Sequence, residues 1–331
     1  MNVAVLGAGS WGTAMAVLLA RNGHDVLLLG RNEEEIASMS THRENFRYLP
    51  GFAIPEGVRF GMLQDHSGEV DMSVVAVPSS GVREVVGSLR GDHPLIVVAA
   101  KGLEAGSAKR MTDVVSEVLP SALVGTLSGP NLALEIVRGI PTAAVAACHD
   151  LEAAERIRGA FMCRTFRVYL SDDVLGVELA GALKNVLAIG AGMSDGLGFG
   201  DNTKGALLAR GLNEMTLLGL TMGARIETFI GLAGVGDLFA TAASTLSRNY
   251  RVGRALGSGA TLAEALESVD QVAEGVTTSE CAQKLARLHS VTMPVFEAIE
   301  TVIHGRLAPR SAVELLMERT PKAEKLPILP N

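Results

Sequence analysis

Cysteine is scarce in this sequence, and the spacing of the few thiols excludes two kinds of site. The chain has 3 cysteines among 331 residues. Cys148, Cys163 and Cys281 are odd in number, lie far apart and lack the short spacing of metal ligands. A disulfide framework and a metal centre are therefore not expected. The thiols are predicted to be reduced residues of the core, as in a cytoplasmic protein.

Long apolar runs and a leader segment are also missing. No apolar run approaches the roughly 18 residues of a membrane-spanning helix. Met1–Leu6 runs straight into a glycine loop, without the basic region and apolar core of a signal peptide. These absences predict a cytoplasmic protein without a membrane span.

Positive charge is not in excess either. Lysine and arginine total 29 against 36 acidic residues, which gives a formal net charge of −7. Nucleic acid is not expected as a partner, because a polyphosphate needs a basic surface. An anionic small molecule is not excluded, since local lysines and arginines decide its binding. At 331 residues and 48% hydrophobic composition, the chain is long enough for two domains.

A glycine-rich loop near the N-terminus predicts a dinucleotide site. The segments around it are a strand over Asn2–Leu6, the loop GAGSWG at Gly7–Gly12, a helix over Thr13–Arg21 and a second strand over Val26–Leu29. This is G-x-G-x-x-G in its required setting. Gly7 allows the turn, Gly9 lets the backbone approach a pyrophosphate, and Gly12 lets the helix pack on the strand. The free N–H groups of the helix N-terminus face the phosphates. A generic glycine turn is the alternative.

The end of the second strand indicates which dinucleotide is used. An NAD-binding protein usually has Asp or Glu there, which holds the ribose 2′-hydroxyl. Here the strand ends in Leu29-Gly30-Arg31-Asn32, without an acid. Arg31 is suited to stack on the adenine and to meet a 2′-phosphate. NADP(H) is therefore favoured over NAD(H), and a surface arginine beside the acidic run Glu33–Glu35 is the alternative.

The first half of the chain alternates strands and helices, as a doubly wound sheet does. The further predicted elements are strands over Asp71–Val77, Leu95–Ala100, Leu123–Leu127, Thr142–Ala147 and Thr165–Leu170, and helices over about Gly81–Leu89, after Ser107, after Asn131 and over Leu151–Phe161. Ligands of such sheets bind beyond the carboxyl ends of the strands. Lys101 in KGLE and Gly129 and Asn131 in SGPN fall there. A solvated loop lysine is the alternative for Lys101.

From about Val174 the pattern predicts helices only. The fold class is therefore α/β, with an N-terminal Rossmann-type doubly wound sheet over residues 1–170 and an all-helical C-terminal domain over residues 171–331. In Val177–Gly192 (VELAGALKNVLAIGAG), Lys184 lies among small apolar residues. Loss of hydration lowers the pKa of such a lysine towards working pH, which makes it a candidate general acid/base. A lysine that reaches the surface from the helix edge is the alternative.

Further candidates follow in this helical half. The loop in Asp195–Lys204 (DGLGFGDNTK) separates the long helix from a second one near Asn202–Met222. Asp237 ends a glycine-rich segment and is either an exposed acid or a polar partner for Lys184. Ser247 is a predicted N-cap, which places Arg248 and Asn249 in the first turn of a helix. An arginine there opposes the helix dipole, so the arrangement favours a phosphate site.

These motifs together resemble the bacterial form of the NAD(P)-dependent sn-glycerol-3-phosphate dehydrogenase family. The resemblance covers nearly the whole chain, through GAGSWGTA, KGLE, SGPN, ELAGALKN, DGLGFGDNTK, GLAGVGDL, SRN and EGV at Glu274–Val276, in that order. It implies reversible reduction of dihydroxyacetone phosphate to sn-glycerol 3-phosphate with NAD(P)H, which feeds glycerophospholipid synthesis. A homodimer is also expected. The chain past Arg319 matches no motif and is expected to be a loose tail.

The resemblance also assigns roles by position. Lys184 matches the catalytic acid/base. The substrate-binding positions are Lys101, Gly129, Asn131, Lys184, Asp237, Ser247, Arg248 and Asn249. With the three loop glycines, the cofactor-binding positions are Gly7, Gly9, Ser10, Trp11, Gly12, Arg31, Tyr48, Lys101, Ala133, Arg248, Val272 and Glu274. Asn131 stands where many bacterial members have serine, and both side chains can hydrogen-bond a substrate.

The chemistry suits these residues. Reduction of a ketone requires hydride on one face and a proton on the oxygen. The Lys184 ammonium can supply that proton, while Asn131 and Asp237 orient the carbonyl. Arg248, Asn249 and Lys204 are candidates to hold the phosphate. None of the seven histidines lies in a glycine-rich motif, so a His–Asp acid/base pair is not favoured.

Two other functions stay open on the sequence alone. A 3-hydroxyacid or ketopantoate-type reductase shares the two-domain plan and a catalytic lysine, but it does not need the phosphate site at Ser247–Asn249. A non-catalytic NAD(P)H-sensing protein keeps the first half and needs neither Lys184 nor that phosphate site. A substrate assay separates these functions.

Overall fold

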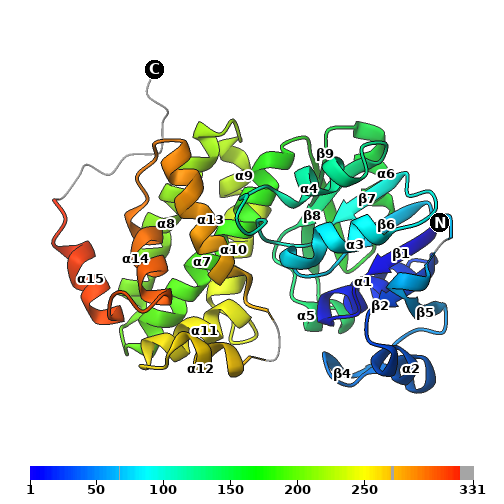
Figure 1. Cartoon of the computed structure of the whole chain (residues 1–331), viewed down its shortest axis with the longest axis horizontal. Coiled ribbons are helices and arrows are strands. Elements are labelled where there is room, and N and C mark those ends of the chain that lie inside the picture. The colour runs from blue at the N-terminus through cyan, green and yellow to red at the C-terminus, as the bar shows by residue number, and fades with distance from the viewer. Residues whose placement is uncertain (67, 270–271, 321–331) are drawn as a thin grey trace. The chain divides into compact units, whose positions relative to one another are not determined.

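The computed structural model describes residues 1–66, 68–269 and 272–320, and these divide into two compact units (Figure 1). The first unit contains Met1–Ala100 and Met111–Val174. The second unit contains Lys101–Arg110 and the chain from Leu175 onwards. The chain therefore changes unit at 174/175 rather than at 170, and one loop segment of the first half is part of the second unit. Nearly all of the expected tail past Arg319 lies outside the described residues.

A single eight-stranded sheet forms the centre of the first unit, in the order β10-β9-β8-β7-β6-β1-β2-β5. Its strands are β1 (Asn2–Leu6), β2 (Asp25–Gly30), β5 (Val58–Met62), β6 (Met72–Val75), β7 (Leu95–Val98), β8 (Leu123–Ser128), β9 (Thr142–Cys148) and β10 (Phe166–Ser171). The run β5-β2-β1-β6-β7-β8 is parallel and has the strand order of dinucleotide-binding domains. The Rossmann-type prediction is confirmed.

One strand of this sheet departs from the parallel pattern. β9 pairs with β8 in antiparallel fashion, while β10 is parallel to β9. The helix between β8 and β9 is α5 (Ala133–Val137), which has only 5 residues. At 1.5 Å per residue such a helix does not span the length of a strand, so it does not return the chain to the start of the sheet as a parallel crossover requires.

Helices cover both faces of the sheet, as expected for a doubly wound fold. Val3 and Val5 of β1 lie in one core with α1 (Ser10–Arg21) and α6 (Leu151–Phe161). Ala4 and Leu6 lie in the other core, with α3 (Val82–Ser88) and α4 (Met111–Val118). The alternation follows from the two-residue period of a strand. The helix α2 (Glu33–His42) begins at the acidic run, with Asn32 as its N-cap. A short ribbon of β3 (Glu44–Asn45) and β4 (Leu49–Ala53) was not predicted.

The second unit is helical, as expected. Its elements are α7 (Val174–Gly196), α8 (Asp201–Thr221), α9 (Ile226–Ile230), a π-helical turn η3 (Leu232–Gly236), α10 (Asp237–Ala242), α11 (Arg248–Gly257), α12 (Leu262–Glu267), α13 (Glu274–Leu288), α14 (Pro294–Ile303) and α15 (Pro309–Met317). One core formed by these helices surrounds α7. Leu103 and Ala108 of the segment Lys101–Arg110 are buried in the same core.

The helix α7 corrects the expectation that no segment is long and apolar enough to cross a membrane. It has 23 residues, and its most apolar window has a mean hydropathy of 1.5. However, 94% of that window is buried inside the protein. The apolar composition of α7 is therefore that of a helix surrounded by other helices, which must be apolar on all sides.

Glycines allow α7 to lie directly against α11. A Cβ added at Gly192 would lie 2.1 Å from the carbonyl oxygen of Tyr250, and one at Gly253 would lie 1.9 Å from that of Ile189. Both distances are far inside van der Waals contact, so only glycine permits this approach. The contact places the first turn of α11 beside the middle of α7.

Candidate active site

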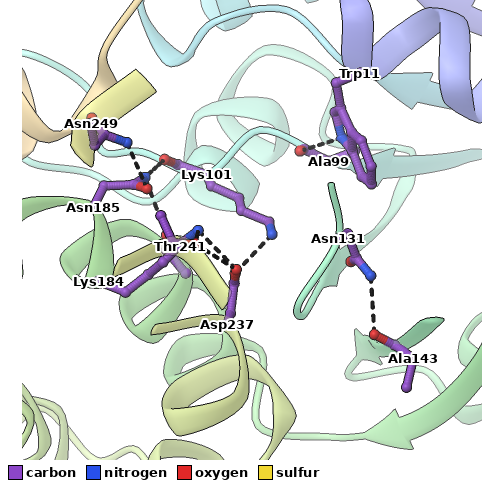
Figure 2. A network of polar contacts seen from close by, with 11 residues as sticks. Trp11, Ala99, Lys101, Asn131, Ala143, Lys184, Asn185, Asp237, Thr241 and Asn249 are labelled. Carbon is purple, nitrogen blue, oxygen red and sulfur yellow. Dashed lines mark hydrogen bonds and ion pairs between the residues drawn. The ribbon is translucent and has the colours of Figure 1, made fainter. Parts of the chain in front are cut away.

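Lys184 is buried near the middle of α7, with only 5% of its surface exposed. Its Nζ donates hydrogen bonds to Asp237 Oδ1 at 2.8 Å and to Thr241 Oγ1 at 2.6 Å (Figure 2). Both acceptors belong to α10, where residues four apart share a face. The lysine therefore points into the protein and does not extend along the helix to the surface.

The surroundings of Lys184 lower its pKa from 10.5 to about 8. Burial is the largest cause, because it penalises the charged amine. The Asp237 carboxylate opposes this effect, while the positive charges of Lys101 and Arg248 add to it. A pKa of about 8 is closer to working pH than that of an ordinary lysine, which suits a general acid/base.

Asp237 joins two lysines through its two carboxylate oxygens. Oδ1 accepts from Lys184, and Oδ2 accepts from Lys101 Nζ at 2.7 Å. Burial by itself raises the pKa of Asp237, but the two ammonium groups outweigh it and hold the pKa below its usual value. Asp237 is therefore the polar partner of Lys184, and an exposed loop acid is excluded by its 2% exposure.

The backbone before Asp237 is shaped by glycine. The π-helical turn η3 ends at Gly236, so Asp237 begins α10. A Cβ at Gly234 would lie 2.0 Å from the carbonyl oxygen of Phe229, which explains the need for glycine at this position of GLAGVGDL. Such π-helical turns often occur at functional sites.

Ser247, Arg248 and Asn249 begin α11 as predicted. Ser247 is the N-cap, and its side chain accepts a hydrogen bond from the backbone N–H of Tyr250. Burial lowers the pKa of Arg248, and the Glu274 carboxylate opposes that shift. The Asn249 side chain donates to Asn185 Oδ1 at 2.9 Å and accepts from the backbone N–H of Gly275 at 2.9 Å.

Lys204 was considered as a phosphate ligand, but in the structure it pairs with a carboxylate. Its ammonium lies 2.8 Å from Asp195, whose carboxylate also accepts from the Tyr250 hydroxyl at 2.6 Å. The Lys204 ion pair raises the pKa of the amine. Lys204 thus connects the start of α8 to the end of α7 and to α11.

In the first unit, the glycine loop has the geometry expected of a phosphate-binding turn. Gly7 has φ +115°, which side chains rarely adopt. A Cβ at Gly12 would lie 1.7 Å from the Gly7 carbonyl oxygen, whereas a Cβ at Gly9 would meet no atom within 4 Å. Gly7 and Gly12 thus serve the turn and the packing, and Gly9 leaves the approach to the loop open. These residues fit a dinucleotide pyrophosphate at the start of α1.

Two side chains fix this loop. Trp11 Nε1 donates to the Ala99 carbonyl at 3.0 Å (Figure 2). Asn45 is buried, and its Nδ2 donates to the Ala8 carbonyl at 3.0 Å and to Thr13 Oγ1 at 2.8 Å. Ser10 is the first residue of α1.

The other predicted residues of the first unit lie at strand ends and loops. Arg31 is exposed directly after β2, and the nearest acid of that strand, Asp25, stands at its start in an ion pair with Arg59. The guanidinium of Arg47 lies over the Tyr48 ring, with its central carbon 4.9 Å from the ring centre. Ala133 begins α5.

Gly129 and Asn131 follow β8. Gly129 has φ +135°, and a Cβ there would lie 3.0 Å from the Ala143 carbonyl oxygen. Asn131 Nδ2 donates to that same oxygen at 3.0 Å (Figure 2). Asn131 Oδ1 is buried without a partner among the described residues. It is therefore suited to accept a hydrogen bond from a ligand.

In the second unit, Glu274 begins α13, and Val272 precedes it with 46% of its surface exposed.

The contacts described above join four of the predicted features of the second unit. They bring Lys101, Lys184, Asp237 and the start of α11 into one polar cluster.

Comparison with known proteins decides the family. The profile described as NAD-dependent glycerol-3-phosphate dehydrogenase N-terminus matches residues 2–154, and the corresponding C-terminus profile matches residues 173–314. The chain belongs to the NAD-dependent glycerol-3-phosphate dehydrogenase family. The chain is 46% identical to the glycerol-3-phosphate dehydrogenase (NAD(P)+) of Desulfitobacterium hafniense over 97% of this chain and 92% of that protein.

Other members of the glycerol-3-phosphate dehydrogenase family agree with this assignment. The enzyme of Thermoanaerobacter sp. with the same name is 45% identical over 98% of this chain and 99% of that protein. A crystal structure of glycerol-3-phosphate dehydrogenase from Coxiella burnetii is 38% identical, with a TM-score of 0.92 over 96% of this chain and 99% of that one.

The sequence alone assigned no role to three side chains. Thr241 and Asn185 belong to the polar cluster around Lys184, and Asn45 contacts the glycine loop. Thr241 follows Asp237 by four residues, and this helical spacing was the signal that could have identified it. Asn185 follows Lys184, but its direction depends on the turn of α7. Asn45 lies in a segment without periodicity or motif, so nothing in the sequence indicated that its side chain contacts the glycine loop.

Proposed function

We propose that this chain reduces dihydroxyacetone phosphate reversibly to sn-glycerol 3-phosphate with NAD(P)H, the product feeding glycerophospholipid synthesis. The observation that carries the proposal is the buried amine of Lys184, held by Asp237 and Thr241 with a pKa of about 8. Membership of the family and the names of the relatives give the substrate class.

The dinucleotide supplies the hydride when it is bound. The glycine loop and the start of α1 hold its pyrophosphate, and Arg31 meets its adenosine half. Lys184 donates the proton that the substrate oxygen requires. An ammonium has three N–H donors, and two of those of Lys184 have acceptors among the described residues. The third is the donor for the ketone oxygen.

Arg248 binds the substrate phosphate in this proposal. Its guanidinium is partly buried at the start of α11, where the backbone N–H groups of the first turn have no partner within the helix. A charge-assisted bond in this setting is strong. The binding energy of the phosphate positions the carbonyl for reaction.

A substrate assay tests the proposal against the reductase alternative. The purified protein should oxidise NADPH or NADH with dihydroxyacetone phosphate, and much more slowly with ketopantoate or 3-oxoacids. Faster turnover of ketopantoate would favour the other reductase. Binding of NADPH without turnover of any of these substrates would favour a sensor.

The preference for NADP(H), the homodimer and the cytoplasmic location stay predictions. The preference for NADP(H) is supported by Arg31, which directly follows β2 where an NAD-binding protein usually has an acidic residue. Sedimentation equilibrium of the full chain tests the homodimer, which should have twice the mass of the 34.6 kDa protomer.

A further inference from the structure

Arg47, in the turn between β3 and β4, is a cation to which neither the motifs nor the family resemblance assigned a role. Its Nη1 lies 2.6 Å from Glu35 Oε1, and its guanidinium carbon lies 4.9 Å from the centre of the Tyr48 ring. Glu35 belongs to the first turn of α2. The two contacts therefore hold the Arg47 guanidinium at the N-terminal end of that helix.

The end of β2 leads to the same place. Arg31 follows this strand and directly precedes Asn32, the N-cap of α2. Gly30 lies against the glycine loop, since a Cβ built there would be 3.2 Å from the Ala8 Cβ. In dinucleotide-binding domains, the residues at the end of this strand contact the adenosine ribose, and a nearby arginine accommodates the 2′-phosphate of NADP. The start of α2 is therefore where that phosphate is expected.

The turn that carries Arg47 is fastened to the glycine loop. Asn45 Nδ2 donates to the Ala8 carbonyl at 3.0 Å, and Asn45 Oδ1 accepts from the backbone N–H of Tyr48 at 3.1 Å. Figure 1 shows β4 and α2 close together in the first unit. The backbone of Arg47 therefore has a fixed position relative to the loop that fits the pyrophosphate.

The ion pair between Arg47 and Glu35 can be exchanged at little cost. The two side chains are 58% and 28% exposed, and ion pairs at such exposed positions contribute little to stability. A phosphate monoester offers three strong acceptor oxygens and a charge of about −1.5 to −2. Arginine binds such a group through two parallel hydrogen bonds. The guanidinium therefore gains more from a phosphate than it loses by leaving the carboxylate.

We propose, resting on the function proposed above and its preference for NADP(H), that Arg47 is a specificity-determining residue for the cofactor, together with Arg31. Its guanidinium leaves Glu35 for the 2′-phosphate of NADP(H). With a cofactor that lacks this phosphate, the guanidinium stays on Glu35. Arg47 therefore adds discrimination between the two cofactors and not general affinity for dinucleotides.

The experiment measures binding of adenosine 2′,5′-bisphosphate and of 5′-AMP to the full chain by isothermal titration calorimetry. The two probes differ only in the 2′-phosphate, and neither needs turnover. Arg47→Gln should weaken the bisphosphate about tenfold or more, the usual effect of losing a hydrogen bond to a charged group. It should leave 5′-AMP nearly unchanged. An unchanged affinity for the bisphosphate, or an equal loss for both probes, would refute the proposal.

Glu35→Gln tests the exchange of partners. The bisphosphate should bind more tightly to this variant, because Arg47 no longer has to leave a carboxylate. Glu34→Gln is the matched control: it removes one negative charge from the same turn of α2 at an exposed position, and its effect should be smaller. Weaker binding of the bisphosphate to Glu35→Gln would refute the exchange, since the carboxylate would then be needed to hold the arginine.

Kinetics with both cofactors give a second measurement. Arg47→Gln should lower kcat/KM for NADPH while the value for NADH and the KM for dihydroxyacetone phosphate are kept. Arg59→Gln is the control, because it also loses an exposed ion pair, with Asp25 at the start of β2. It should leave the ratio of the two cofactors unchanged. An equal fall of this ratio in Arg59→Gln would refute the proposal, since net charge alone would then set the preference.

Failure of this proposal can be told apart from failure of the proposed function. Absence of wild-type turnover with dihydroxyacetone phosphate would refute the proposed function, whereas binding of the two probes would still decide the role of Arg47. Equal wild-type affinities for the two probes would refute both the NADP(H) preference and that role. If Arg47→Gln does not fold, Arg47→Met, which keeps an apolar stem beside Tyr48, replaces it in the same comparison.

Discussion

At the scale of single residues, the carboxylate of Asp237 sets the charge around the amine of Lys184. It pairs with Lys184 on one oxygen and with Lys101 on the other. With Lys184 protonated, two positive charges and one negative charge leave a local excess of +1. In the proposed reaction, such an excess in a water-poor site would stabilise the negative charge that develops on the ketone oxygen.

Replacement of Lys184 by alanine removes the proton donor without leaving a buried charge alone. Asp237 keeps its ion pair with Lys101 at 2.7 Å, so the variant should fold and bind NADPH. Turnover should fall by at least the ~10²–10⁴-fold typical of general acid/base removal. Steady-state kinetics and a NADPH titration measure the two effects. A folded variant with more than about a tenth of the wild-type rate, above the range given for such groups, would contradict the assignment.

The pKa of Lys184 predicts opposite pH profiles for the two directions. Ketone reduction needs the ammonium, so kcat should be level below pH about 8 and fall above it. Alcohol oxidation needs the neutral amine and should rise through the same pKa. Asp237 raises the pKa of Lys184, so Asp237→Asn should move the limit of reduction below pH 8. Profiles that run in the same sense in both directions would exclude Lys184 as the acid/base.

Arg31 decides cofactor choice in the proposed function. It is exposed directly after β2, and no acid there repels a 2′-phosphate. The wild-type protein should accept NADPH at least as well as NADH. Arg31→Asp removes a cation and adds a ribose acceptor, so it should shift the ratio of kcat/KM towards NADH. If the ratio stays the same, Arg31 serves only as an adenine support or a surface residue.

At the scale of elements, the contact between α7 and α11 positions the site. α7 carries Lys184 and Asn185, and α11 begins with Arg248 and Asn249. Their backbones approach closely enough that Gly192 and Gly253 have no room for a Cβ. Any shift at this contact therefore moves the first turn of α11, the proposed phosphate site, relative to Lys184, the proposed proton donor.

Gly192→Ala should test this contact, with Gly205→Ala as the matched control. A methyl group at Gly192 overlaps the Tyr250 carbonyl at 2.1 Å, whereas one at Gly205 in α8 meets nothing within 4 Å. The first should destabilise the protein by ~1–3 kcal/mol or more and raise KM for dihydroxyacetone phosphate. The second should stabilise it by about 0.5–1 kcal/mol, because alanine favours a helix over glycine. Urea unfolding gives both values, and equal effects would show that the contact tolerates a side chain.

At the scale of the whole molecule, the two units have separate cores, and only the first contains a tryptophan. Trp11 is the single tryptophan of the chain and lies in the glycine loop of the first unit. Its fluorescence reports on that unit, while helical circular dichroism is weighted towards the second unit. The two signals therefore follow different parts of the protein.

NADPH should stabilise the two units unequally. Ligand at 100 times Kd adds about 2.7 kcal/mol to the part that binds it. The urea midpoint from Trp11 fluorescence should then rise more than the midpoint from circular dichroism, because the glycine loop belongs to the first unit. Equal shifts of both midpoints would show that the units unfold as one.

The sequence predicted features that depend on neighbours along the chain. Ser247 was identified as an N-cap because capping requires a short polar side chain before a helix. Lys184 was identified because its neighbours are apolar. Contacts between distant segments left no such signal: Asn45 reaches the glycine loop from a two-residue strand, and β9 runs antiparallel because α5 is short.

The path of the chain between the units limits how such a gene can be inherited in pieces. The polypeptide enters the second unit at Lys101, returns at Met111 and leaves the first unit again after Val174. A single recombination near codon 175 would therefore join Asp237 of one ancestor to Lys101 of another, together with the buried residues Leu103 and Ala108. The cofactor unit and the catalytic unit are thus expected to descend together. A family member assembled from two parents would need two further crossovers, one on each side of Lys101–Arg110.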